Sequence, residues 1–399
     1  MARFPVPLIL ACGCAIALIG FGERSAFGLF QADMVAARPW DRETFALAFA
    51  IQNLMWGIGQ PIAGALADRY GTMRVLMGGA IVYALCIVAM AEFESALALY
   101  LSFGLVMGLA MAASSFTIVL SAFGRAVTPA KRTLAFGLGT AAGSLGMFIF
   151  GPLGATVIAS SGWYVGLYMF AGFAMLVVLL AIPLQGRSAP DPNIMPQSLR
   201  EALGEAFSYR SYVLLVIGFF VCGFHVAFII AHLPAYLTDL GFSAQLGGIA
   251  LALIGLFNVA GSLAAGAIGQ RVSKPYALAF LYAARSLVIA AFVLIPISPA
   301  SVLIFSAVMG LLWLSTVPLT SGLVAVMFGP RYMATLFGMV FLSHQVGSFL
   351  GVWLGGVIYE QTGSYDMLWW IGVLLGVLAA LVHLPIRDAP APRLANAPG

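Results

Sequence analysis

The residues that could do chemistry in this chain are few, and they stand inside long apolar runs. They are two arginines and several amides and imidazoles, namely Arg24, Asn53, His225, Asn258, Arg285, His344 and Gln345. A polar group in an apolar medium costs free energy unless it has a partner, so these residues are candidates for ligand binding or for hydrogen bonds between helices. An arginine in such a place needs an anion or several acceptors, and a histidine changes charge near neutral pH.

The two arginines differ in their surroundings. Arg24 follows Glu23 in the outer half of the first apolar run, and adjacent residues do not share a helix face. Arg24 could therefore meet an anion while Glu23 faces another helix or water, or both could reach the outer interface. Arg285 lies ten residues beyond Pro275, about 15 Å along a helix and so near the middle of a bilayer core of about 30 Å. A substrate carboxylate, polar neighbours or a distant interface could compensate its charge.

The sequence contains no motif of an enzyme active site. It has no phosphate-binding lysine loop, no zinc-binding helix motif and no pair of carboxylates that would face each other across a cleft. The four cysteines all fall inside apolar runs, where they are expected to pack as small residues. We therefore predict no catalytic residue, no metal and no cofactor.

The composition indicates a membrane protein. Hydrophobic residues make up 62% of the chain and charged residues 8%, whereas roughly a quarter of the residues in soluble domains are charged. A span needs roughly 20 apolar residues. We count twelve, at about 7–30, 44–67, 74–92, 97–121, 133–158, 163–184, 211–235, 244–268, 275–296, 300–326, 334–358 and 366–385. The predicted fold is an all-α membrane protein.

Charge and proline content set the orientation and the boundaries. With both termini in the cytoplasm, the inner segments collect fourteen of the eighteen basic residues. The stretch 187–210 holds Pro190, Pro192 and Pro196 and then a short surface helix from Ser198, so it reads as a cytoplasmic linker. It separates an N-terminal six-helix bundle, 1–186, from a C-terminal one, 211–387, and the tail 388–399 is predicted to be disordered.

A charged turn stands between the second and third spans. Residues 64–74 read Gly-Ala-Leu-Ala-Asp-Arg-Tyr-Gly-Thr-Met-Arg. They resemble, at all six fixed positions, the signature Gly-x-Leu-x-Asp-Arg-x-Gly-x-x-Arg of the major facilitator superfamily. A weaker copy begins at Gly266, 202 residues later, with Gln270 in place of Asp68 and Arg271 over Arg69. Val-Met-Gly at 106–108 and at 308–310 has the same offset, which indicates a duplication into two parallel halves.

Three further segments resemble bacterial monocarboxylate-transporter-like facilitators. They begin at Gly22, Cys222 and Phe341, and the resemblance covers nearly the whole chain. It implies proton-coupled movement of small organic anions, with a basic residue close to Arg24. Characterised carriers place an acid or amide and an arginine four apart on the eighth helix, where this chain has Asn258 and Ser262. The missing arginine gives more weight to Arg24 and Arg285.

These observations predict a secondary transporter of the bacterial inner membrane that works by alternating access as a monomer. The expected partners are the lipid bilayer, a small organic anion and protons, and no nucleic acid. The anion would meet Arg24 or Arg285 together with Asn53, His225, Asn258, His344 and Gln345. The alternatives are an exporter of hydrophobic drugs or neutral metabolites, and a membrane sensor that does not transport.

The charged turn predicts a cytoplasmic gate as well. Its members would be Asp68, Arg69, Arg74, Arg132 and Arg271, and their charge contacts would close the inner side. Asp68 is the one acid among these cations, so its loss would leave several of them without a partner.

Overall fold

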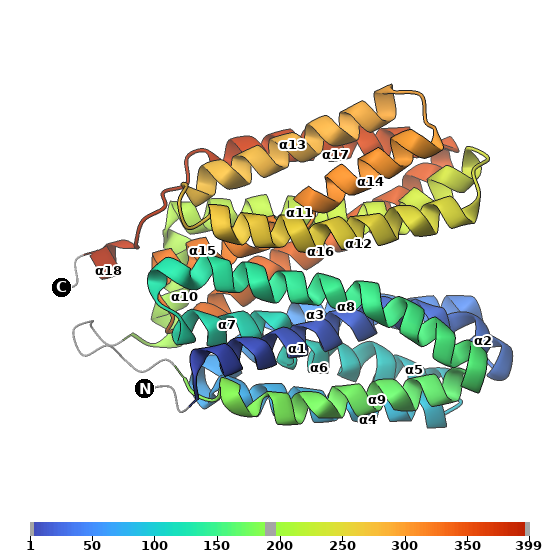
Figure 1. Cartoon of the computed structure of the whole chain (residues 1–399), viewed down its shortest axis with the longest axis horizontal. Coiled ribbons are helices and arrows are strands. Elements are labelled where there is room, and N and C mark those ends of the chain that lie inside the picture. The colour runs from blue at the N-terminus through green and yellow to red at the C-terminus, as the bar shows by residue number, and fades with distance from the viewer. Residues whose placement is uncertain (1–3, 188–196, 396–399) are drawn as a thin grey trace. The chain divides into compact units, whose positions relative to one another are not determined.

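The computed structural model describes residues 4–187 and 197–395, and all its regular elements in these ranges are helices (Figure 1). Three parts of the chain lie outside the described residues: the N-terminus with Arg3, the part of the predicted linker that holds its prolines, and the last four residues. The first half of the chain forms α1 (Val6–Ala26), η1 (Phe27–Phe30), α2 (Gln31–Ala37), α3 (Arg42–Tyr70), α4 (Thr72–Glu92), α5 (Ala96–Leu99), η2 (Tyr100–Val106), α6 (Met107–Ala113), α7 (Phe116–Ala126), η3 (Pro129–Lys131), α8 (Arg132–Ser161), α9 (Trp163–Leu180) and η4 (Ile182–Leu184).

The second half begins with a short helix and continues with long ones. Its elements are α10 (Leu199–Ser208), α11 (Arg210–Asp239), α12 (Ala244–Ile268), α13 (Lys274–Leu294), α14 (Pro299–Leu312), α15 (Thr316–Phe328), α16 (Met333–Thr362), α17 (Asp366–His383) and α18 (Pro392–Ala395). The helices α4 and α13 begin and end 202 residues apart, as the sequence repeat requires.

All twelve predicted spans form helices, with ends within a few residues of the predicted ones. Eleven helical segments of the described chain are long and apolar enough to cross a membrane. The helix α3 is long enough but does not count among the eleven, because Gln52, Asn53 and Gln60 lower its hydropathy. Gln52 and Gln60 are fully buried and donate hydrogen bonds to the segment that contains η2, α6 and α7.

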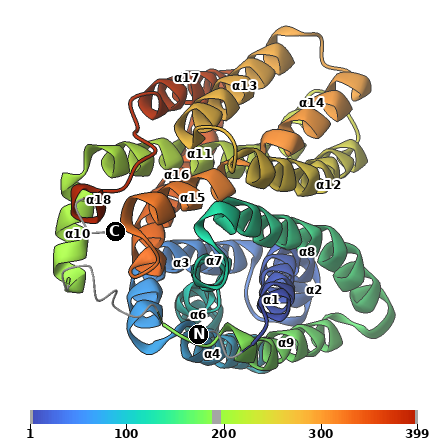
Figure 2. The same cartoon turned by 60° about the vertical axis from the view of Figure 1, so that its left-hand side comes forward.

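The chain folds into two compact units (Figure 2). The first comprises residues 1–129, 142–190 and 330–338, and the second comprises 130–141, 191–329 and 339–399. The long helices α8 and α16 thus contribute residues to both units. Within the first unit α4 packs along α9, and within the second α13 packs along α17. The division of the chain into two six-helix halves at the linker remains a prediction.

Pro318 indicates broken backbone hydrogen bonds in the tenth span. The fourth and tenth spans were each predicted as one segment, and both are interrupted. The first is interrupted at Ser114–Ser115, between α6 and α7, and the second at Trp313–Ser315, between α14 and α15. An interrupted helix in a membrane needs other partners for its backbone groups. Gln60 on α3 donates to Ala112 O at 3.4 Å and to Ser115 Oγ at 3.1 Å. A side chain of a neighbouring helix thus provides hydrogen bonds at the break between α6 and α7.

The short helix predicted after Ser198 is present. Ser198 caps α10 by accepting from Glu201 N, and Ser198 N donates to the Glu201 carboxylate at 2.7 Å. This hydrogen bond holds the pKa of Glu201 below its usual range.

The described part of the tail is ordered, in contrast to the prediction for 388–399. Asp388 pairs with Lys274 at 3.4 Å, and Arg393 on α18 pairs with Glu205 on α10 at 3.0 Å. Ala391 N also donates to Met327 O at 2.9 Å. The Pro and Ala content of the tail suggested disorder, but these contacts hold residues 388–395 within the second unit.

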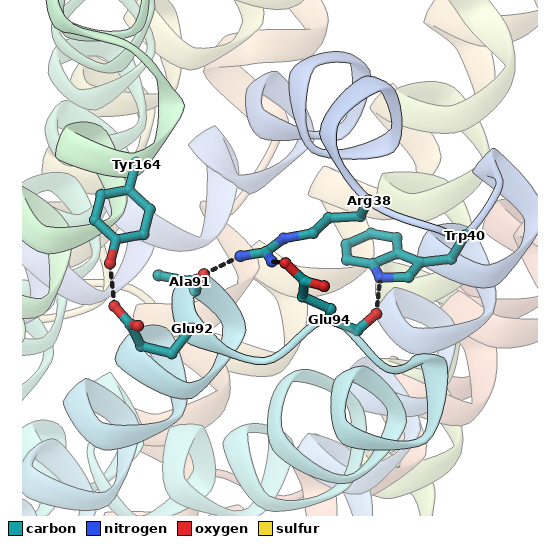
Figure 3. A network of polar contacts seen from close by, with 6 residues as sticks. All are labelled: Arg38, Trp40, Ala91, Glu92, Glu94 and Tyr164. Carbon is teal, nitrogen blue, oxygen red and sulfur yellow. Dashed lines mark hydrogen bonds and ion pairs between the residues drawn. The ribbon is translucent and has the colours of Figure 1, made fainter.

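A polar network fastens one end of the first unit (Figure 3). Arg38, just after α2, pairs with Glu94 at 2.8 Å and also donates to Ala91 O at the end of α4. Trp40 Nε1 donates to Glu94 O at 2.7 Å, and Tyr164 on α9 donates to Glu92. The network ties the segment between α2 and α3 to the end of α4, and it ties α4 to α9.

Candidate binding cavity in the first unit

A small cavity lies inside the first unit, next to the predicted residue Arg24. Its walls come from α1, α3, α4, α9 and the segment that contains α6 and α7. Its volume is about 40 Å³, and one water needs roughly 10–15 Å³. Most of the wall is apolar or aromatic, including Phe116, and the polar side chains are Glu23, Arg24, Trp56, Tyr83, Ser114 and Ser115.

Arg24 is half-buried, and α3 positions its side chain. Its Nη2 group donates a hydrogen bond to Asn53 Oδ1, while Asn53 Nδ2 donates to Phe49 O at 2.8 Å. The guanidinium carbon lies 4.7 Å from the centroid of the Trp56 ring, which is a cation–π contact. Arg24 Nε is buried without a hydrogen-bond partner in the described part of the chain. The structure thus brings Arg24 and Asn53 together and leaves a donor of the guanidinium unused.

Two further titratable side chains face the same cavity. Glu23 is 1% exposed, and its Oε1 atom has no hydrogen-bond partner among the described residues. Tyr83 on α4 is also buried, and its hydroxyl group also has no hydrogen-bond partner among the described residues. Tyr83 lies near enough to both Glu23 and Arg24 to interact with them electrostatically. The sequence left open where Glu23 points, and the structure buries it inside the unit, at the wall of the cavity.

A close helix contact sets the rotation of α1. A Cβ atom on Gly146 of α8 would collide with the backbone oxygen of Leu18, so only glycine permits this approach. Phe150 of α8 fills the space beside Gly22. One side of α1 is therefore held against α8, and Glu23 and Arg24 line the cavity with α3 and α4.

Arg285 has a different environment, in the second unit. It is 1% exposed, and its guanidinium donates to Leu312 O, at 2.6 Å from Nη2 and 3.1 Å from Nε, and to Trp313 O. Asn258 Oδ1 accepts from Leu314 N at 2.9 Å. These two predicted site residues therefore meet at the break between α14 and α15, where they satisfy backbone groups. Arg285 Nη1 is buried without a partner in the described residues.

The predicted imidazoles lie in separate contacts of the second unit. His225 is buried on α11, and its Nε2 lies 2.7 Å from Gly372 O of α17. His344 Nδ1 lies 3.1 Å from Gln345 Oε1, and the His344 ring stacks on Phe341. His225 is also near enough to Arg285 to interact with it electrostatically.

The charged turn after α3 makes contacts that the sequence did not indicate. Gly71 has φ of 95°, which favours glycine at this reversal. The Asp68 carboxylate accepts from Thr335 N at 2.9 Å and from Thr335 Oγ1 at 2.7 Å, and it interacts electrostatically with Arg125. Thr335 lies 267 residues further along the chain, so no local pattern could have paired it with Asp68.

The other members of the predicted gate differ in exposure. Arg69, Arg74 and Arg271 are exposed, and Arg132 is half-buried. The grouping of these residues with Asp68 as a gate stays a prediction.

The family model described as Major Facilitator Superfamily matches residues 12–352. The chain belongs to the major facilitator superfamily. The resemblance drawn from the charged turn is therefore confirmed, and so is the fold class of two parallel six-helix bundles.

This major facilitator protein is similar to other members over nearly its whole length. It is 25% identical over 382 residues to the uncharacterized MFS-type transporter YcxA of Bacillus subtilis (strain 168), covering 92% of this chain and 91% of YcxA. It is 27% identical over 388 residues to monocarboxylate transporter 13 of Bos taurus, covering 93% and 88%. Its fold matches that of the proton:xylose symporter XylE bound to 6-bromo-6-deoxy-D-glucose, with a TM-score of 0.75 and 13% identity over 99% of both chains.

The duplication expected of a major facilitator protein relates the two polar clusters. Leu18 and Phe220, which are 202 residues apart, make the same contact, the first with Gly146 and the second with Gly347. With this offset Glu23 corresponds to His225, and Tyr83 corresponds to Arg285. Each half thus buries one titratable side chain on its first long helix and one on its third, and the two are near enough to interact electrostatically. Tyr83 was not among the predicted site residues, although the repeat offset to Arg285 could have singled it out.

Replacing Asp68 by Asn should shift this transporter toward its inward-open state and slow its turnover. The amide removes the charge that faces Arg125 and weakens the bonds to Thr335. Hydrogen bonds to a charged group contribute about 1.5–3 kcal/mol, so the ratio of states should change by roughly 10- to 150-fold. Labelling of single cysteines from the inner side would measure the shift, with the exposed Asp33→Asn as control. Labelling identical to that of the wild type would contradict the prediction.

Proposed function

We propose that this protein is a secondary transporter of small organic anions that works by alternating access, with Arg24 as the group that binds the anion. The observation that carries the proposal is the state of Arg24. Arg24 lines a cavity and stands on a helix that is long and apolar enough to span a membrane. One of its buried donors has no partner among the described residues.

The contacts of Arg24 suit an anion site. Asn53 and Trp56 hold the guanidinium from one side without neutralising it. A guanidinium keeps its charge under all ordinary conditions, so an anion is its natural partner in a place of low polarity. A neutral or cationic ligand would leave that charge uncompensated.

The substrate class also agrees with a relative. Monocarboxylate transporter 13 of Bos taurus, by its name, carries monocarboxylates, and it aligns with 93% of this chain. We propose that the present protein also transports a small carboxylate, and that a proton moves with it. The same proposal places the protein in the bacterial inner membrane with both termini in the cytoplasm. It also includes the predicted residues of the second unit in the binding of the anion.

A second candidate is an exporter of hydrophobic compounds. Its support is the wall of the cavity, which is mainly apolar and includes Phe21, Met111 and Phe116. In that case Arg24 would be structural. The two candidates differ in whether a negatively charged solute moves.

Uptake into proteoliposomes tests the proposal. The purified protein would be offered a panel of labelled monocarboxylates and dicarboxylates, with and without an inward proton gradient. We expect accumulation of at least one small carboxylate, and faster accumulation when the gradient is present. Transport of hydrophobic neutral compounds together with no movement of any carboxylate would favour the exporter instead.

A further inference from the structure

We propose that Tyr83 and Gly20 complete the anion site at Arg24. The Tyr83 hydroxyl group donates a hydrogen bond to the carboxylate that Arg24 binds, and the space beside Gly20 holds the rest of the acid. The substrate is then a short monocarboxylate such as formate or acetate. This inference rests on the proposed function and adds to it a second binding group and a limit on the size of the substrate.

The first support is the unused hydroxyl group of Tyr83. Tyr83 is 4% exposed, and its hydroxyl group has no hydrogen-bond partner within the described chain. Tyr83 lines the same cavity as Arg24 and interacts with it electrostatically. A buried hydroxyl group without a partner costs free energy, so a native fold that keeps one at a cavity asks for an explanation such as a ligand.

Two unused donors thus lie at the wall of one small cavity. One is Arg24 Nε on α1, and the other is the Tyr83 hydroxyl group on α4. A carboxylate has two oxygen atoms, so it accepts from two donors at once. Arg24 provides the charge that compensates the anion, and Tyr83 provides a hydrogen bond to it. Hydrogen bonds to an ionised acceptor are about twice as strong as those between neutral groups.

The second support is a glycine on the cavity wall that helix packing does not require. A Cβ atom on Gly13 or on Gly22 of α1 would collide with a phenylalanine ring. A Cβ atom on Gly20 would meet nothing within 4 Å, and Gly20 lines the cavity. Glycine weakens a helix relative to alanine. Packing therefore does not explain Gly20, whereas space for a ligand does.

The corresponding position of the second unit carries a larger side chain. With the offset of 202 residues, Gly20 corresponds to Cys222 on α11. Cys222 is fully buried, and its Sγ atom lies 3.2 Å from Thr316 Oγ1. A side chain thus fills in the second unit the position that Gly20 leaves open in the first.

The cavity is small and mainly apolar, which limits the acid that it holds. Its volume is about 40 Å³, and one water needs roughly 10–15 Å³, so the space suits formate or acetate better than lactate or a longer acid. Met111 and Val177 are among the apolar lining residues. They suit a methyl group, whereas a second carboxylate would lie against them without a partner.

Glu23 is an acid on the wall of the same cavity. Tyr83 interacts electrostatically with Glu23 as well, but the Tyr83 hydroxyl group is not hydrogen-bonded to it. A negative charge on Glu23 would oppose the anion, so Glu23→Gln should bind acetate at least as tightly as the wild type. Loss of binding in this variant would show that the carboxyl group is the second binding group, and the inference would fail.

Tyr83→Phe in proteoliposomes tests the hydroxyl group, with labelled formate and acetate as probes. The loss of one hydrogen bond to a charged group should raise the KM of both acids by roughly 10- to 150-fold. Tyr276→Phe changes an exposed tyrosine of α13 and should keep the wild-type values. Equal KM values for the wild type and Tyr83→Phe would overturn the inference and leave the proposed function standing.

Gly20→Ala tests the space beside the anion. The added methyl group meets no protein atom, so the variant should fold, but it takes room from the methyl group of acetate. Uptake of acetate relative to formate should fall by roughly 10- to 200-fold. Gly172→Ala adds a methyl group to an exposed and equally open position of α9, so it should keep the ratio. An unchanged ratio in Gly20→Ala would overturn the size limit, as would a wild type that takes up lactate as fast as acetate.

Thermal unfolding of the purified protein in detergent separates binding from transport. A ligand that binds the folded protein raises the unfolding midpoint, so acetate should stabilise the wild type more than it stabilises Tyr83→Phe. If this difference is found but no carboxylate moves in proteoliposomes, the transport proposal fails and the inference about binding stands. If formate and acetate neither stabilise the wild type nor move, while longer acids do, the inference fails and the proposed function stands. If no carboxylate binds or moves, both fail.

Discussion

Replacing Arg24 by Gln should reduce carboxylate uptake by roughly 30-fold to several thousand-fold. Loss of one partner of a buried, hydrogen-bonded charge pair costs about 2–5 kcal/mol, and every 1.4 kcal/mol is about tenfold in affinity. The glutamine can still bond to Asn53, so the variant should fold while it loses the cation. Initial uptake rates over a range of concentrations would show the loss as a raised KM.

Two further variants identify the cause of that loss. Arg24→Lys keeps the charge but loses the planar group that lies over Trp56, so it should retain part of the uptake. Arg200→Gln removes an exposed arginine of α10 and should have no effect. Equal uptake of carboxylates by the wild type and Arg24→Gln would show that the anion binds elsewhere, even in a functioning transporter.

Replacing Arg285 by Met should destabilise the protein by about 2–6 kcal/mol, since each of two buried carbonyls that loses its donor costs roughly 1–3 kcal/mol. The two carbonyls are those of Leu312 and Trp313 at the end of α14, and they would lie in a membrane span without water. Thermal unfolding of the purified variant in detergent would show a lower midpoint. Arg285→Gln should lose less, because its amide can still donate to one carbonyl.

The stability measurement separates the two roles proposed for Arg285. If Arg285→Met unfolds at the wild-type temperature and no longer takes up carboxylates, the arginine belongs to the anion site rather than to the helix break. Arg200→Gln serves here too as the control for loss of an arginine charge, because its side chain is exposed in the same unit.

The sequence was sufficient to predict the helices and the family. A bilayer offers backbone groups no partners, so every span must be a helix of about 20 apolar residues, and such runs are visible without a structure. The charged turn around Asp68 and the offset of 202 residues then indicated the family and its duplication. Arg24 could be singled out on the same basis, because an arginine within an apolar run costs free energy unless it has a partner, which makes it a candidate for binding.

The tertiary structure decided which polar residues meet. Asp68 bonds to Thr335, and Arg285 bonds to carbonyl groups at the break in the tenth span. Pro318 signals broken backbone hydrogen bonds in that span but does not identify Arg285 as the partner. Glu23 and Tyr83 share a cavity because glycine contacts with α8 fix the rotation of α1. Such pairings depend on side-chain packing between helices that are far apart in the chain. A pattern along one helix can show that a buried polar residue needs a partner, but the partner is supplied by a neighbouring helix, whose position only the folded chain determines.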